Sequence, residues 1–295
     1  MNKWFCSVAG LFLVGAGSLA AQAQTPAVPP PNILNIQTDT IKPYEEGPYD
    51  KLASQYPALS GQLEDPTHVV GLESLTGSPR AIYISGYDSY EALQKNEEWL
   101  LGDAATDTKF DALDSRVAPH LSGVDYAVWH YRADLSNNVA GVDLPHAHYW
   151  EVIIYRMHPG HAQQFEELAK LHRDANVKSG QNTPWATYEG GTGVTEAFLM
   201  VVPMASLKDK DTTLTHEKDL GTASGDEGKR RMNKLSEENV ASVEDNIWMV
   251  IPEWSYVDKS WIEADRQFWA PGPAAKHGSK PAAGASAALR VPQAH

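Results

Sequence analysis

The sequence contains a single cysteine, Cys6, and that residue lies in an apolar stretch at the N-terminus. If this stretch is removed, the remaining chain has no thiol, which excludes disulfides and a cysteine nucleophile. The Gly-x-Ser-x-Gly sequence that presents a serine nucleophile is also absent. The fold must therefore rest on buried apolar surface, and nucleophilic catalysis finds no support in the sequence.

Positive charge is scarce as well. Lysine and arginine total 24 against 38 aspartates and glutamates, which gives a net charge of −14. Binding to nucleic acid depends on clustered lysine and arginine that neutralise phosphates, so this balance argues against a nucleic-acid partner. It argues in the same way against an anionic membrane surface.

Long apolar runs are also missing. The longest lies in residues 4–19 and is shorter than the roughly 20 residues that span a membrane. It follows a short basic start, and Ala21-Gln22-Ala23 has the small-x-small form of a signal-peptidase site. The sequence therefore predicts a signal peptide over 1–23, an exported product in the periplasm or outside the cell, and no membrane contact after cleavage near Ala23. A proline-rich linker is expected over 24–31.

The rest of the chain reads as two similar units, 32–144 and 145–258, each with the order β-α-β-β-α-β. Equivalent strands are separated by about 117 to 120 residues, which indicates an internal duplication. Residues 259–269 form a short aromatic segment, and 270–295 are predicted to be disordered. In the first unit we expect strands at 33–38, 68–75, 80–86 and 124–135 and helices at 45–63, 88–101 and 108–121, with Pro57 interrupting the first helix. In the second we expect strands at 149–157, 185–189, 196–202 and 245–257 and helices at 161–177, 205–209 and 229–242, with a polar break at 222–228.

Tandem β-α-β-β-α-β units resemble the dimeric α+β barrel class. The breaks Ile41-Lys42-Pro43 and Arg156–Gly160 are similar to those of the NIPSNAP and antibiotic-biosynthesis-monooxygenase groups, as is the passage Gly86–Leu93. The segment Trp261–Trp269 resembles the ends of exported bacterial proteins of unknown function. This resemblance implies an α+β fold in which two ferredoxin-like units form an intrachain barrel, with antiparallel sheets face to face and helices outside. Members of the class oxidise polyketides, degrade haem or bind small ligands, so the resemblance does not select one activity.

His146 and His148 are the sharpest chemical signal. Residues two apart in an extended segment face the same side, so both imidazoles could reach one divalent metal ion, with His130, Glu151 or His158 as the third ligand. Two histidines do not make a metal site alone. The alternative is that both are surface or hydrogen-bonded structural histidines, and no cofactor is otherwise expected.

Alternation on two strands predicts a polar and aromatic pocket. The candidate ligand-binding residues are His130, Arg132, His146, His148, Trp150 and Arg156, which would suit an aromatic or carboxylated ligand. The alternative is that Arg132 and Arg156 form ion pairs with Glu151, Glu189 or Asp125 on a sheet surface.

Three functions remain open at this level. The first is binding of a small molecule. The second is a cofactor-independent or metal-assisted monooxygenase acting on a small aromatic or polyketide-like substrate, with its catalytic residues unassigned. The third is a non-catalytic protein that associates into homo-oligomers.

Overall fold

The computed structural model describes residues 29–181 and 183–270 of the 295-residue chain; the predicted signal peptide, most of the predicted linker and all but the first residue of the predicted tail lie outside them. Eight antiparallel strands close into a barrel in the order β1-β3-β2-β8-β5-β7-β6-β4. The strands are β1 (Ile33–Ile41), β2 (Val69–Ser74), β3 (Arg80–Tyr87), β4 (Leu121–Tyr131), β5 (Tyr149–Met157), β6 (Ala186–Gly190), β7 (Ala197–Met204) and β8 (Val240–Val250). The predicted fold class is therefore confirmed.

The two halves repeat one another around the barrel. The first half has the order β4-β1-β3-β2, and the second has the corresponding order β8-β5-β7-β6. Pairing of β2 with β8 and of β4 with β6 joins the halves. A β-bulge follows Thr40 in β1 and Arg156 in β5, so the duplication extends to a local irregularity of the backbone.

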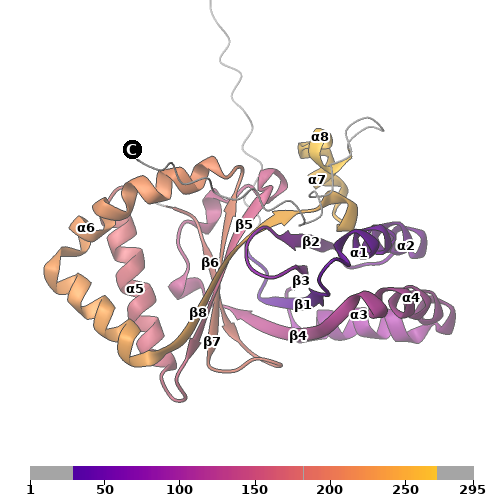
Figure 1. Ribbon diagram of the computed structural model, residues 1–295, viewed down its shortest axis with the longest axis horizontal. Coiled ribbons are helices and arrows are strands. Elements are labelled where there is room, and N and C mark those ends of the chain that lie inside the picture. The colour runs from indigo at the N-terminus through magenta and orange to yellow at the C-terminus, as the bar shows by residue number, and fades with distance from the viewer. Residues whose placement is uncertain (1–28, 182, 271–295) are drawn as a thin grey trace, which may run out of the picture.

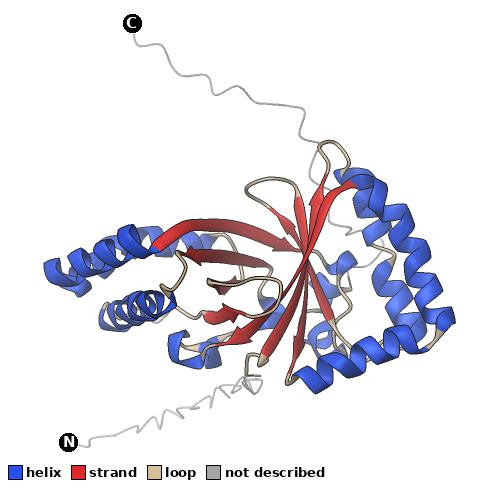
Figure 2. Ribbon diagram, turned by 90° about the horizontal axis from the view of Figure 1, so that it is seen from below, coloured by secondary structure: helices blue, strands red, loops and turns tan. Residues whose placement is uncertain are grey.

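Helices cover the barrel from outside on two opposite sides (Figures 1 and 2). The first half contributes α1 (Glu46–Ala53), α2 (Tyr56–Leu63), α3 (Tyr90–Gly102) and α4 (Ala104–Val117), and the second contributes α5 (Ala162–Lys178) and α6 (Lys208–Asn239). Two short helices, α7 (Lys259–Ala264) and α8 (Arg266–Trp269), follow. In the described part of the chain, the helices are too short or too polar to cross a membrane.

The barrel interior is filled by alternate residues of the strands. On β1, Leu34 and Ile36 point inward and belong to the main apolar core together with Trp129 of β4 and Trp150 of β5. Leu34 pairs with Trp129 across β1 and β4. Neighbouring residues on β1 must therefore face outward, toward the helices.

Several predicted element bounds are wrong by a few residues. The strands expected at 124–135 and 245–257 end at Tyr131 and Val250, because the chain turns into 3₁₀ helices at Ala133–Leu135 and Pro252–Trp254. The helix expected to begin at Thr108 begins at Ala104, where Asp103 accepts hydrogen bonds from the Ala105 and Thr106 backbone N–H groups. The polar break expected at 222–228 is a kink at Gly225 (φ 67°) inside α6.

The chain after β8 crosses back onto the first half. Pro252–Trp254 packs beside β2, and Gly71 permits the approach, since a Cβ atom there would lie 2.8 Å from the Trp254 carbonyl oxygen. Trp254 is 3% exposed and belongs to the apolar cluster between the first sheet and its helices. One tryptophan from the end of the second unit thereby becomes part of the helix layer of the first.

Candidate functional site

The outward faces of the two halves differ in chemistry. On the first half, the outward residues of β1, β3 and β4 are mostly polar or phenolic, and cross-strand pairs set Gln37 between Tyr83 and Tyr126 and Asn35 between Ser85 and Val128. A strand face covered by helices is ordinarily apolar, since polar groups buried there need hydrogen-bond partners. This face is therefore suited to contact a ligand as well as helices.

On the second half much of the corresponding face is covered by apolar side chains, and its buried Glu151 is paired with Lys210. Phe198 of β7 stacks on Phe165 of α5 with ring centroids 4.0 Å apart, and both are 1% exposed. Tyr155 of β5 packs against the same cluster. In the second half, a packed apolar core therefore fills space between the sheet and its helices.

On the first half the sheet and its helices enclose a cleft of about 920 Å³. Strands β1, β3 and β4 form its floor, and α2, α3, α4 and the Trp254 segment form its walls. Such a volume lies within the range typical of small-molecule sites. Its lining includes Asn35, Gln37, Asp39, Tyr56, Asp65, Tyr83, Ser85, Tyr87, Glu97, Trp99, Phe110, Asp114, Val124, Tyr126, Trp254 and Tyr256.

Asp39 lies at the floor of this cleft and is 2% exposed. Its Oδ1 accepts a hydrogen bond from Gln37 Nε2 at 2.8 Å, and its Oδ2 accepts one from the Tyr49 hydroxyl at 2.8 Å. The Tyr49 hydroxyl lies 2.8 Å from that of Tyr83, which lines the cleft. Burial raises the pKa of Asp39, and the negative charge of Asp114 adds to the rise, while the hydrogen bonds from Gln37 and Tyr49 lower it. A buried carboxyl with a raised pKa in a cleft is typical of functional sites.

This raised pKa predicts how stability depends on pH. Below about pH 3.9, the ordinary pKa of aspartate, Asp39 is protonated in both folded and unfolded chains. As the pH rises, the unfolded chain ionises first, so wild-type stability should fall relative to Asp39→Asn until the pH passes the raised pKa. A difference of one between the pKa in the folded chain and the pKa in the unfolded chain changes the free energy of unfolding by about 1.4 kcal/mol. Urea unfolding of both proteins from pH 3 to 8 measures this, and a wild-type stability that rises relative to Asp39→Asn with rising pH would contradict it.

Helix α3 forms an outer wall of the cleft without packing firmly on the sheet. None of its residues, all of which the structure describes, is buried. Its apolar side chains Trp99 and Leu100 line the cleft, and on the floor opposite Tyr126 is 62% exposed and Val124 is 41% exposed. Apolar surface of this kind is available for contact with a ligand.

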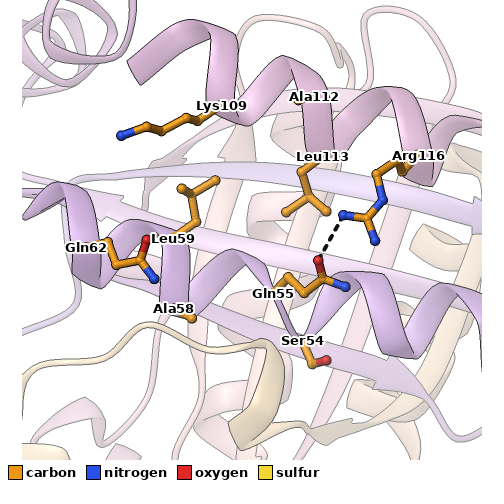
Figure 3. A pocket seen from close by; sticks show the side chains of 9 residues that line it. All are labelled: Ser54, Gln55, Ala58, Leu59, Gln62, Lys109, Ala112, Leu113 and Arg116. Carbon is orange, nitrogen blue, oxygen red and sulfur yellow. Dashed lines mark hydrogen bonds between the residues drawn. The ribbon is translucent and has the colours of Figure 1, made fainter. Parts of the chain in front are cut away.

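A second hollow of about 540 Å³ lies between α2 and α4, on the side of α4 that carries Lys109 and Arg116 (Figure 3). Arg116 Nη1 donates a hydrogen bond to Gln55 Oε1 across it at 3.0 Å. The hollow is open to solvent, and its two cationic side chains are exposed. The cleft over the sheet is the better candidate because it is deeper and combines aromatic rings with a buried carboxyl.

The six side chains predicted as ligand-binding from the sequence are distributed over several places. Arg132 forms ion pairs with Asp134, Glu166 and Glu189, as in the ion-pair alternative. Arg156 is exposed, with Glu244 at 3.9 Å. Trp150 points into the barrel, where its Nε1 donates to the Ala147 carbonyl at 3.1 Å.

The histidines of that set also have separate partners. His130 faces outward on β4, and its Nε2 lies 2.7 Å from the Tyr90 hydroxyl. His146 ends a 3₁₀ turn, with its Nδ1 2.9 Å from Asp143, and the carboxylate of Asp143 raises the pKa of His146. His148 Nε2 lies 2.9 Å from Asp265 Oδ2, and its ring stacks on Phe268 at 3.7 Å between centroids.

The described donor groups can be compared with those that a metal ion or a haem requires. Within residues 29–181 and 183–270, no group of three or more histidines, cysteines, aspartates or glutamates is arranged to hold a metal ion. Histidine or cysteine most often holds a haem iron, and the cleft lining includes neither, although it includes tyrosines, which hold haem in some proteins. The polar side chains that line the cleft carry carboxyl, phenol, hydroxyl and amide groups.

None of the six side chains predicted as ligand-binding lines the cleft. The signal was present in Asn35, Gln37 and Asp39, whose alternation with Leu34 and Ile36 predicts a strand that is apolar on one face and polar on the other. That pattern would ordinarily indicate an exposed outer face. It becomes informative only when helices are known to cover the strand.

No protein-family model matches the sequence, and no curated protein does. Among solved structures, an anthrone oxidase-like protein superposes with a TM-score of 0.51 at 12% identity, covering 77% of this chain and 94% of that one. A suspected monooxygenase from Fusobacterium nucleatum gives 0.48 at 13% identity, covering 76% and 94%. A mutant chlorite dismutase from Candidatus Nitrospira defluvii gives 0.46 at 11% identity, covering 81% and 97%. The first of these shows that the chain shares the dimeric α+β barrel fold.

Proposed function

We propose that this protein binds a small aromatic molecule in the cleft between the first sheet and α2, α3 and α4. The observation that carries the proposal is the contrast between the duplicated halves, since a packed core fills one while the other keeps a polar floor under a cavity of about 920 Å³. Polar groups at the base of an aromatic cavity fix the orientation of a ligand, and the rings supply contact area. As the leader sequence suggests, we further propose an exported protein, with NIPSNAP-like proteins as its nearest functional class.

Two exposed tyrosines offer a matched test. Tyr126→Ala removes a ring that is 62% exposed inside the cleft, and Tyr44→Ala removes one that is 80% exposed outside it. We expect Tyr126→Ala to weaken binding of 2-naphthalenemethanol about ten-fold, from loss of an aromatic contact worth roughly 1 kcal/mol or more, and Tyr44→Ala to leave it unchanged. Calorimetric titration gives the affinities, and melting curves verify that both variants fold. Equal affinities in all three proteins would place the ligand elsewhere.

A second candidate function is oxidation of the bound molecule by dioxygen, as in a cofactor-independent monooxygenase. Asp39 favours it, because a buried carboxyl with a raised pKa is suited to accept a proton from an activated C–H or phenolic O–H group. In a ring methylene, for example, the carbon would lose two hydrogens and gain one oxygen atom of O₂ as a carbonyl. The second oxygen atom would leave with those hydrogens as water.

Anthrone and a dioxygen electrode test this second function. Enzymatic oxidation predicts oxygen uptake by the wild type and its loss in Asp39→Asn at anthrone concentrations that saturate both proteins. If 2-naphthalenemethanol binds but no oxygen is taken up with anthrone, only the binding function is supported. The other carboxylates near the cleft disfavour a substrate that becomes negatively charged, which is why binding stands first.

A further inference from the structure

The charge of the cleft has one sign. Its lining includes four acidic residues, Asp39 of β1, Asp65 after α2, Glu97 of α3 and Asp114 of α4. All its lining residues are described, and none is lysine, arginine or histidine. The cavity and its aromatic walls make the cleft a candidate ligand-binding site. The carboxylates determine which charge on a ligand the cleft favours.

The hydrogen-bond donors to these carboxylates are neutral groups. Asp114 accepts a hydrogen bond from the Tyr56 hydroxyl, and Asp65 accepts one from the Ser60 hydroxyl and one from the Thr67 backbone N–H. Burial raises the pKa of Asp65, and the hydrogen bonds from Thr67 and Ser60 oppose that rise, as does the nearby His68, which does not line the cleft.

Elsewhere in the described part of the molecule, several carboxylates are paired with cations. Arg132 binds three of them, Arg231 binds Glu167 at 2.6 Å, and Lys210 binds Glu151. Neutral donors stabilise a carboxylate without cancelling its charge, so the ionised carboxylates of the cleft keep a negative potential there. Low-dielectric walls strengthen such a potential inside a cavity.

The aromatic rings of the same cleft favour the same charge. Tyr126 is largely exposed there, and Trp99, Phe110 and Tyr56 surround the opening. The faces of tyrosine and tryptophan rings attract cations, most strongly when the cation is only partly hydrated. An ammonium group between the rings and the carboxylates would satisfy both, and an aromatic or apolar body would cover the remaining rings.

We infer that the ligand of this cleft is an organic cation, an amine or quaternary ammonium group attached to an aromatic or apolar body. The inference rests on the proposed binding function and narrows its ligand class. It replaces the carboxylated ligand that the arginines of the sequence suggest, since Arg132 is committed to three carboxylates and Arg156 lies outside the cleft lining.

Three probes with one ring system test the inference: 2-naphthylmethylamine as the cation, 2-naphthalenemethanol as the neutral probe and 2-naphthoate as the anion. By calorimetry at pH 7 we expect the cation to bind about ten-fold or more tightly than the neutral probe, and the anion to bind most weakly. Raising the salt concentration should weaken binding of the cation and leave the neutral probe unchanged.

The double variant Glu97→Gln with Asp114→Asn should remove most of the preference for the cation. The control Asp226→Asn with Glu237→Gln makes the same change in net charge on α6, in the second half, and should keep the preference. Equal affinity for cation and neutral probe, or preference for the anion, would overturn the inference while leaving the binding function intact. Failure of all three probes to bind would overturn the binding function itself.

Discussion

Replacing Trp254 with alanine is expected to lower the free energy of unfolding by about 3–5 kcal/mol, the usual cost of truncating a buried aromatic residue. The indole is 3% exposed, meets the Tyr49 ring edge-on at 5.5 Å between centroids, and donates a hydrogen bond from Nε1 to Asp50 Oδ1 at 2.9 Å. The same side chain lines the cleft. The loss of stability should therefore be accompanied by a loss of ligand binding of about ten-fold or more, measured with 2-naphthylmethylamine under conditions where the variant is folded.

Trp254→Phe separates the two contributions. Phenylalanine keeps an aromatic ring in the cluster but loses the hydrogen bond to Asp50, for which we expect a cost of about 1–3 kcal/mol, because it also leaves the Asp50 carboxylate without that donor. Binding should be largely kept. If the alanine variant unfolded at the same urea concentration as the wild type, the contact between the end of the second unit and the first helix layer would not be part of the folded core.

Most of the fold could be predicted from the sequence, because the alternation of polar and apolar residues in strands and the periodicity of helices are local patterns. The run from Ile33 to Thr38 and the run from Tyr149 to Met157 predict strands whichever elements they pair with. The ends of the strands and helices were harder to predict. The end of β8 depends on Pro252 and on how Trp254 packs against Gly71, a contact between residues far apart in the chain.

The candidate site was harder to predict from the sequence than the fold, for a physical reason. Histidines and arginines attract attention in a sequence because their charges suit ligands and metals, yet charged groups also bind one another. Arg132 meets Glu166 and Glu189 only when β4, α5 and β6 come together, and His148 meets Asp265 from the distant α8. Asp39, a single carboxylate in a strand, becomes notable only when burial and the Tyr49 hydroxyl are known.

The duplication itself explains how one half can carry a site. Barrel closure depends on the inward residues of both halves, which form one apolar core. The outward residues are freer to differ, provided that each helix layer still buries enough apolar surface. Here the second half retains that burial through Phe165 and Phe198, and the first half places polar groups under a cavity.

Phe198→Ala tests this division of roles. We expect it to lower the free energy of unfolding by about 3–5 kcal/mol, because the ring is 1% exposed and stacks on Phe165 at an interplanar angle of 12°. Affinity for 2-naphthylmethylamine should stay within about two-fold of the wild type, since none of the residues of this cluster lines the cleft and distant sites behave additively. Urea unfolding and calorimetry supply the two measurements.

The matched control is Phe198→Leu, which keeps most of the apolar volume and should cost less than about 1.5 kcal/mol. A loss of affinity in Phe198→Ala as large as that of Trp254→Ala would mean that the ligand contacts both halves. Stability loss with unchanged affinity in Phe198→Ala, beside loss of both in Trp254→Ala, would assign packing to the second half and binding to the first. Both truncations remove a buried aromatic ring, so the difference in their effects on affinity reports which helix layer contacts the ligand.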